Sequence, residues 1–117
     1  MRHHVKKRTL HRDKRQREAL LSSLARSLIL QEGITTTVAK AKELRPYVER
    51  LVSIGKKNSL ASRRTIVAQI RDAAVVKKLH DALRQRFAKR AGGYTRIIRL
   101  GRVGKRAIES ARIEFVK

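Results

Sequence analysis

The segment KRAGGYTR, residues 89–96, holds the residue types best suited to contact a phosphate or a nucleobase. Its two glycines leave backbone N–H groups uncovered and let the chain approach a phosphate closely. Arg90 and Arg96 flank the glycines, and Tyr94 could stack on a base. The alternative is a glycine helix cap followed by a strand, with Tyr94 in the core. The segment is not a Walker loop, because no Gly-Lys-Ser/Thr run precedes a helix.

Basic residues recur along the whole chain rather than in one tail. Of the 31 Lys and Arg residues, 19 are arginine, whose planar guanidinium group binds phosphate oxygens in pairs and stacks on bases. A protein that recognises a duplex DNA sequence would instead concentrate such residues on one helix that fits a groove. The spread, with pairs such as Arg63-Arg64, predicts contacts with a folded RNA on several sides. A single pair such as Lys56-Lys57 can equally be a solvated surface.

Catalytic and metal-binding patterns are weak in this sequence. His3, His4 and His11 lack a cysteine or a nearby carboxylate to complete a structural zinc site, and contacts with RNA explain them better. His80 stands alone on a predicted helix, where we expect a surface or boundary position. No paired carboxylates and no Ser/His/acid arrangement stand apart from structural uses. We therefore predict no enzyme activity, no metal site and no cofactor.

The overall composition supports an ordered basic domain. The chain has 117 residues, the size of one domain, and a formal net charge of +22, which favours a polyanionic partner. Leu, Ile, Val and Phe together number 32, enough for a folded core. No run of about 18 apolar residues predicts a membrane span, no cysteine predicts a disulfide, and the first ten residues lack the apolar core of a signal peptide.

The N-terminal half predicts a basic arm, a helix, a strand and a second helix. Residues 1–12 contain no acidic residue and no hydrophobic period, so we expect an extended arm that orders on its partner. Asp13 can cap a helix over residues 14–31, and Gly33 can supply the positive φ that stops it. The β-branched run 34–38 predicts a strand. The next apolar stripe keeps its phase across Pro46, which predicts one kinked helix.

The C-terminal half predicts two further helices and two strands. Asn58-Ser59 can cap a short helix that ends at residue 70, and Asp72 can cap another that ends at Ala91-Gly92-Gly93. Strands are expected over 94–100 and 111–116, joined by a basic turn over 101–106. We predict a two-layer α+β fold over residues 13–117, with a small three-stranded sheet packed on about four helices. The free face of the sheet and the arm would be left for the partner.

Several segments of the chain resemble one known family. They are the start MRH, the segment ITTTVAKAKELRPYVERLVSIGK at 34–56, the pair Arg63-Arg64, the loop RAGGYTRI at 90–97 and the closing ARIEFV. Together they resemble the bacterial large-subunit ribosomal protein L17 family over nearly the whole chain. The resemblance implies a two-layer α+β protein of the cytoplasm that binds large-subunit rRNA and supports assembly and architecture of the subunit. It implies a position on the solvent side near the exit tunnel mouth, among neighbouring ribosomal proteins, with no membrane or small-molecule partner.

The resemblance also implies which residues contact rRNA, and the loop chemistry adds Arg90. These residues are Arg2, His3, Arg8, Arg12, Thr36, Lys40, Lys42, Arg45, Arg63, Arg64, Arg90, Gly92, Gly93, Tyr94 and Arg96. The chain departs from the family pattern at His11, at Gln16-Arg17 and in the basic turn VGKRA over 103–107.

Two other functions fit a strongly basic small protein. An architectural DNA-binding protein would share the steep salt dependence, because each neutralised phosphate releases counterions. A small RNA-modifying enzyme would need a catalytic carboxylate that the sequence does not single out. A comparison of binding to folded rRNA and to duplex DNA separates the first of these from the rRNA-binding function.

Overall fold

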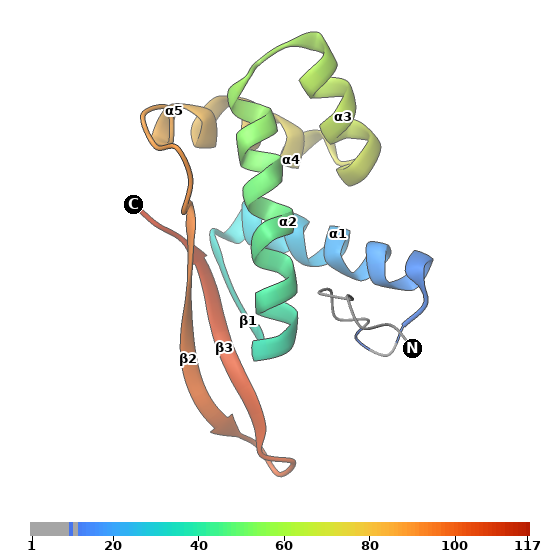
Figure 1. Ribbon diagram of the computed structural model, residues 1–117, viewed down its shortest axis with the longest axis vertical. Helices are drawn as coiled ribbons and strands as arrows, with labels where there is room; N and C mark the ends of the chain where they lie inside the picture. Colours follow the sequence, from blue (N-terminus) through green and yellow to red (C-terminus); the bar gives the residue numbers. More distant parts are fainter. Residues whose placement is uncertain (1–9, 11) are drawn as a thin grey trace, which may run out of the picture.

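The computed structural model describes residue 10 and residues 12–117 and contains an α+β fold (Figure 1). The predicted arm over residues 1–12 therefore falls almost entirely outside the described residues. In chain order the elements are α1 (Lys14–Gln31), β1 (Gly33–Thr37), α2 (Val38–Lys56), α3 (Leu60–Ile70), α4 (Ala73–Lys78), the π-helical segment η1 (Leu79–Leu83), α5 (Arg84–Arg86), β2 (Thr95–Val103) and β3 (Ile108–Phe115). The predicted α+β class and the succession of elements are confirmed.

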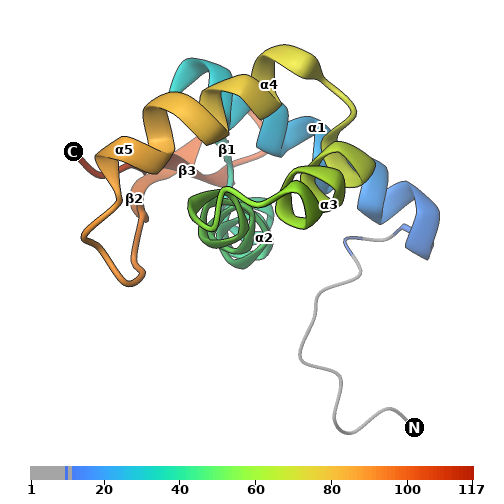
Figure 2. The same ribbon diagram turned by 90° about the horizontal axis from the view of Figure 1, so that it is seen from above.

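The three strands form one antiparallel sheet in the order β1-β3-β2. The central strand β3 alternates as predicted: Ala111, Ile113 and Phe115 are buried, whereas Arg112 is exposed. Figure 2 shows α2 end-on, with the strands on one side of it and α3 on the other. The helix α2 is therefore the central support of the fold, because its apolar stripe contributes residues to the same core as the sheet.

Helix α1 begins as predicted, but Gly33 does not stop it. The Asp13 side chain accepts a hydrogen bond of 2.8 Å from the backbone N–H of Gln16. At the other end the left-handed residue is Glu32, with φ of 66°, and its N–H donates to the carbonyl of Leu28. Gly33 is instead the first residue of β1, paired with Glu114, so it adopts strand geometry. The prediction that Gly33 supplies the positive φ is therefore wrong, because Glu32, one residue earlier, supplies it.

Helix α2 runs without interruption through Pro46, as the phase of its apolar stripe predicts. Pro46 itself is exposed, and Leu44, Val48 and Leu51 are buried. The preceding strand ends at Thr37 rather than at residue 38, because the Thr37 side chain caps the helix by accepting from the N–H of Lys40.

Two serines cap α3, and a buried histidine lies in the following helical stretch. Ser59 and Ser62 form a reciprocal capping box, each side chain accepting from the other residue's N–H at 3.0 Å. Asp72 caps α4 as predicted. His80 is 1 % exposed, so the expected surface or boundary position is wrong. The π-helical turn of η1 changes the helical phase there, which a sequence count at 3.6 residues per turn does not anticipate.

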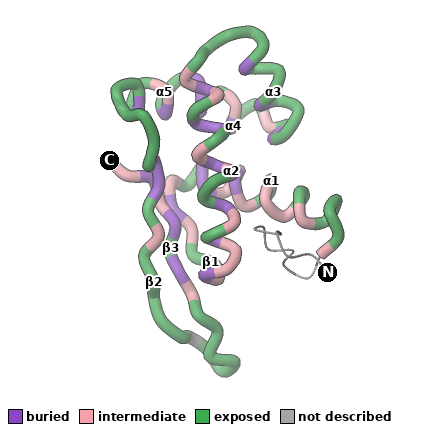
Figure 3. The backbone as a smooth tube through the Cα atoms, viewed as in Figure 1, coloured by how far each residue is buried: buried purple, intermediate pink, exposed green. Residues whose placement is uncertain are grey.

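The C-terminal hairpin is longer than the sequence predicts. Strand β2 continues through Gly101 to Val103 and pairs with β3 back to Ile108, with a bulge around Leu100, so the turn is confined to residues 104–107. The hairpin extends past the end of β1, whose pairing with β3 stops at Ser110. Figure 3 shows this end as almost wholly exposed, whereas buried segments gather around α2 and the middle of β3.

Candidate nucleic-acid interface

The predicted phosphate loop lies on the surface between α5 and β2. Residues 88–93 are exposed, and Gly93 adopts a φ of 63°, a conformation that glycine reaches without strain. The Nε atom of Arg90 donates to the carbonyl oxygens of Gly92 and Gly93, both at 3.2 Å. The arginine thus folds over its own loop, which places a guanidinium group and two exposed glycines side by side.

Tyr94 is in the core, so its ring is not available to stack on a base. Its side chain is 1 % exposed and its ring packs against Phe87, with centroids 5.1 Å apart. Its hydroxyl contacts Ser53 Oγ at 3.3 Å and accepts from Lys56 Nζ at 3.1 Å. Burial raises the pKa of Tyr94, but the hydrogen bonds with Ser53 and Lys56 outweigh burial and leave the pKa below its ordinary value. Of the two alternatives for Tyr94, the core position is the one observed.

Contacts with α2 fix both ends of the loop. Lys56 Nζ also donates to the carbonyl of Arg90. The carboxylate of Glu49 accepts from the N–H and the hydroxyl of Thr95, both at 3.1 Å. Arg45 Nε lies 3.9 Å from the same carboxylate. Glu49 therefore links Arg45 to the start of β2, although 46 positions of the chain separate Glu49 from Thr95.

Two arginines and one glutamate form an ion-pair cluster on the open face of the sheet. Arg96 Nη2 lies 3.0 Å from one oxygen of Glu114, and Arg112 Nε lies 3.3 Å from the other. The hydrogen bond from Arg96 is the main cause that lowers the pKa of Glu114, so the carboxylate stays ionised. The cluster keeps one surplus positive charge on a preorganised surface. Arg112 was not among the predicted contacts, although its place between two inward residues of a strand indicates an outward side chain.

The remaining predicted contacts on β1 and α2 do not all share that face. Thr36 is half-buried and pairs with Ala111, a residue of the covered face of the sheet. Lys40 and Lys42 lie in the first turns of α2, half-buried and exposed respectively. The predicted residues are therefore distributed over several surfaces rather than gathered in one pocket.

Arg63 and Arg64 are exposed on α3, at the opposite end of the molecule from the hairpin turn (Figure 1). The principal extents are 44 × 34 × 25 Å, so these arginines and the hairpin can touch different parts of a large partner. The hairpin adds exposed basic residues that the family resemblance did not assign, namely Arg99, Arg102, Lys105 and Arg106. In the sequence, the run of basic residues around Gly101 and Gly104 indicates this surface.

Most of the contacts predicted for the arm cannot be placed, because they fall outside the described residues. Arg2, His3 and Arg8 lie outside the described residues. Arg12 is half-buried, and its Nη1 donates to the carbonyl of Leu10 at 2.7 Å. No group of three His, Cys, Asp or Glu residues that could hold a metal occurs in the part of the chain that the structure describes. None of the helices described is both long and apolar enough to cross a membrane.

Comparison with known proteins identifies one family that covers most of this chain. The family model of ribosomal protein L17 matches residues 20–116. The large ribosomal subunit protein bL17 of Sphingopyxis alaskensis is 49% identical over 116 residues, which cover 99% of this chain and 84% of that protein. A match over this share of the chain confirms the resemblance seen in its segments. The chain belongs to the ribosomal protein L17 family.

Proposed function

We propose that this chain is a structural constituent of the large ribosomal subunit that binds large-subunit rRNA and supports assembly and architecture of the subunit. Family membership supports the place in the subunit. The proposal includes a cytoplasmic location, neighbouring ribosomal proteins as further partners and no catalytic role. Phosphate neutralisation is the binding mechanism, since Arg and Lys side chains release counterions from the RNA as they bind.

The observation that carries the proposal is the surplus of exposed cations after the internal ion pairs are formed. Glu32 binds Lys78 and Arg86 and joins the end of α1 to the later helices. Glu49 and Glu114 are likewise occupied by contacts within the fold. Nine acidic residues cannot balance 31 basic ones, so most cationic groups on the surface need an external anion.

The proposed contacts fall on three surfaces. The loop surface comprises Arg90, Gly92, Gly93 and Arg45, and Tyr94 supports it from the core rather than by stacking. The sheet surface comprises Arg96 with Arg112, and the α3 surface comprises Arg63 and Arg64. Lys40, Lys42 and Thr36 belong to the proposed contacts of α2 and β1. Arg2, His3, Arg8 and Arg12 belong to those of the arm.

A binding comparison tests the proposal. The full chain should bind folded large-subunit rRNA more tightly than duplex DNA of equal length at about physiological salt in filter binding. It should also sediment with large subunits through a sucrose gradient. Equal affinity for the two polymers, together with sedimentation apart from subunits, would support an architectural DNA-binding protein instead.

Arg64 offers a variant test, because it is exposed on a capped helix. Arg64→Ala should weaken rRNA binding and reduce the slope of log K against log salt by about 0.7 to 0.9, the loss of one phosphate contact. Arg64→Lys keeps the charge and should keep the slope. A large loss of melting temperature with unchanged binding would assign Arg64 to structure instead.

A further inference from the structure

Tyr47 differs from every other Phe and Tyr of the chain in its access to the surface. The sequence contains two Tyr, two Phe and no Trp. Phe87, Tyr94 and Phe115 are between 1 % and 4 % exposed and belong to the core. Tyr47 is only partly buried, at the edge of that core. If this protein stacks a phenyl or phenol ring on a base, the ring is that of Tyr47.

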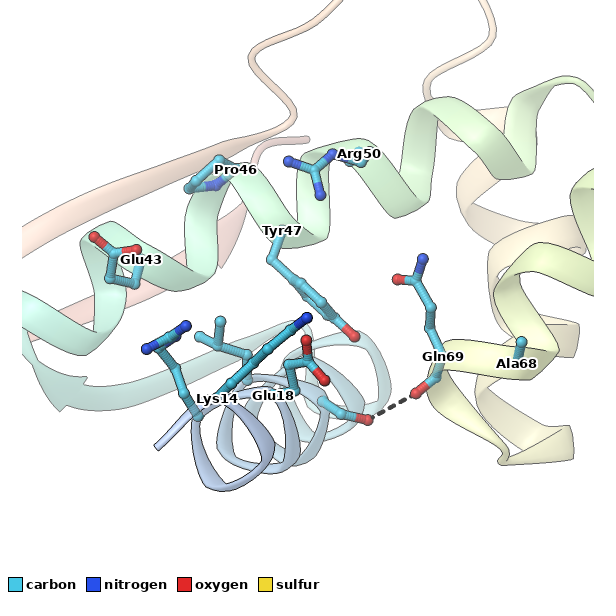
Figure 4. Close-up of a pocket in the computed structure, with 11 residues that line it drawn as sticks. Lys14, Glu18, Glu43, Pro46, Tyr47, Arg50, Ala68 and Gln69 are labelled. Carbon is cyan, nitrogen blue, oxygen red and sulfur yellow. Dashed lines mark hydrogen bonds between the residues drawn. The ribbon is translucent and has the colours of Figure 1, made fainter. Parts of the chain in front are cut away.

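Tyr47 lines a cleft between α1, α2 and α3 with a volume of about 550 Å³. Sites for small ligands commonly measure about 300 to 1,000 Å³. Figure 4 shows Tyr47 extending from α2 between the other two helices, with Lys14 and Glu18 on the α1 side and Gln69 on the α3 side. The cleft thus has room for one nucleotide beside an aromatic ring.

A hydrogen-bond network holds the floor of the cleft in place. Ser22 of α1 donates to the carbonyl of Gln69 at 3.0 Å and accepts from Arg26 at 3.1 Å, and Arg26 also donates to the carbonyl of Ile70 at 3.1 Å. Tyr47 lines the cleft beside Ser22 and is only partly buried, so part of its side chain is open to a ligand.

The charged groups around the cleft favour a base inside and a phosphate at the rim. Lys14, Arg17 and Arg50 supply three positive charges, against Glu18 and Glu43. Carboxylates repel a phosphate but accept hydrogen bonds from the amino groups of a base. Arginine and lysine at the edge can bind the phosphate that follows the base.

We propose that this cleft binds one unstacked nucleotide of the RNA, with its base against the Tyr47 ring and its phosphate at the basic rim. Single-stranded RNA is commonly recognised by stacking splayed bases on aromatic side chains and reading their edges. The inference rests on the proposed rRNA binding and assigns it a defined nucleotide site. Stacking tolerates any base, whereas the carboxylate of Glu18 favours one with amino or imino donors on its edge.

Two variants of Tyr47 in the full chain test the site by filter binding to large-subunit rRNA. Tyr47→Leu removes the ring and should weaken binding roughly 5- to 100-fold. Tyr47→Phe keeps the ring and removes only the hydroxyl, so its affinity should stay within about twofold of the unaltered protein. Unchanged binding by Tyr47→Leu would overturn the site and leave the cleft to another occupant. Equal weakening by both variants would also overturn it, because loss of the hydroxyl rather than of the ring would then be responsible.

Ultraviolet cross-linking of the unaltered protein to the same rRNA gives a second measurement that needs no variant. Mass spectrometry should find a nucleotide attached to the peptide that contains Tyr47. If Tyr47→Leu melts at a much lower temperature, its weaker binding could come from lost stability, and the cross-link then decides whether the site exists. Absence of the cross-link would in that case overturn the site. Failure of the unaltered protein to bind rRNA would refute the proposed function itself. Tight rRNA binding without a Tyr47 contact would refute only the cleft.

Discussion

The guanidinium group of Arg112 lies directly over Gly33 on the neighbouring strand. A Cβ atom at position 33 would lie 2.2 Å from Nη2 and 2.7 Å from Cζ of Arg112. Gly33 pairs with Glu114, and Glu114 binds both Arg112 and Arg96. The missing side chain of Gly33 therefore makes room for the ion-pair cluster on the open face of the sheet.

Gly33→Ala should displace Arg112 while leaving the fold intact, because the clash is with the flexible end of a long side chain. We expect a change in the free energy of unfolding below about 1 kcal/mol, since Ala tolerates strand geometry. We expect rRNA affinity to fall roughly two- to tenfold as the preorganised arginine is lost. In an Arg112→Ala background the same substitution should have no further effect on affinity, which a double-mutant cycle measures. Additive losses would show that Gly33 acts independently of Arg112.

Removal of residues 1–12 should leave the domain folded and lower its rRNA affinity. The segment carries five Lys and Arg residues and no acidic residue, so the net charge falls from +22 to 22 − 5 = +17. The Asp13 cap of α1 is retained. The salt slope should fall by up to about 3.5 to 4.5, the loss of five phosphate contacts. Circular dichroism checks the fold, and unfolding on truncation would show that the arm belongs to the core.

His80→Leu should stabilise the protein. The imidazole is buried, and neither ring nitrogen has a hydrogen-bond partner among the described residues. An unsatisfied buried polar group costs about 1 to 3 kcal/mol, so an apolar side chain of similar size should raise the free energy of unfolding by about 1 kcal/mol. Thermal or urea unfolding measures the difference, and a loss of stability would mean that the imidazole has a favourable role in the folded state.

His80→Leu should also reduce the pH dependence of the free energy of unfolding. Burial, and then the positive charges of Arg63 and Arg84, lower the pKa of His80 in the folded state. Because the unfolded chain takes up this proton near pH 6.5 and the folded chain takes it up only at lower pH, stability falls as the pH drops below about 6.5. The slope is at most about 1.4 kcal/mol per pH unit. It should be smaller in His80→Leu, and an unchanged slope would assign the effect to other groups.

Ser59→Ala should destabilise the helix that presents Arg63 and Arg64. Loss of an N-cap side chain costs about 1 kcal/mol, and the reciprocal contact with Ser62 would be lost as well. Ser59→Asp keeps an acceptor at the cap and should restore most of the stability. Urea unfolding measures both variants, and equal stability of Ser59→Ala and the unaltered protein would show that the cap contributes nothing.

Local chemistry predicted most of the elements correctly. Asp13, Ser59 and Asp72 cap helices because their side chains accept from backbone N–H groups a few residues away, which is a short-range interaction. The alternation of Ala111, Ile113 and Phe115 predicted the buried face of β3 for the same reason. The excess of cations was also fixed by the sequence alone, since no fold can neutralise 31 basic residues with nine acidic ones.

Only the tertiary structure decided the positions that depend on residues far apart in the sequence. Tyr94 is buried because Phe87, Ser53 and Lys56 surround it, and no local pattern separates that position from a base-stacking one. Glu49 supports β2 across 46 positions of the chain. The residue type sets what a side chain can bind, whereas packing decides which groups reach it and which surface remains for a partner.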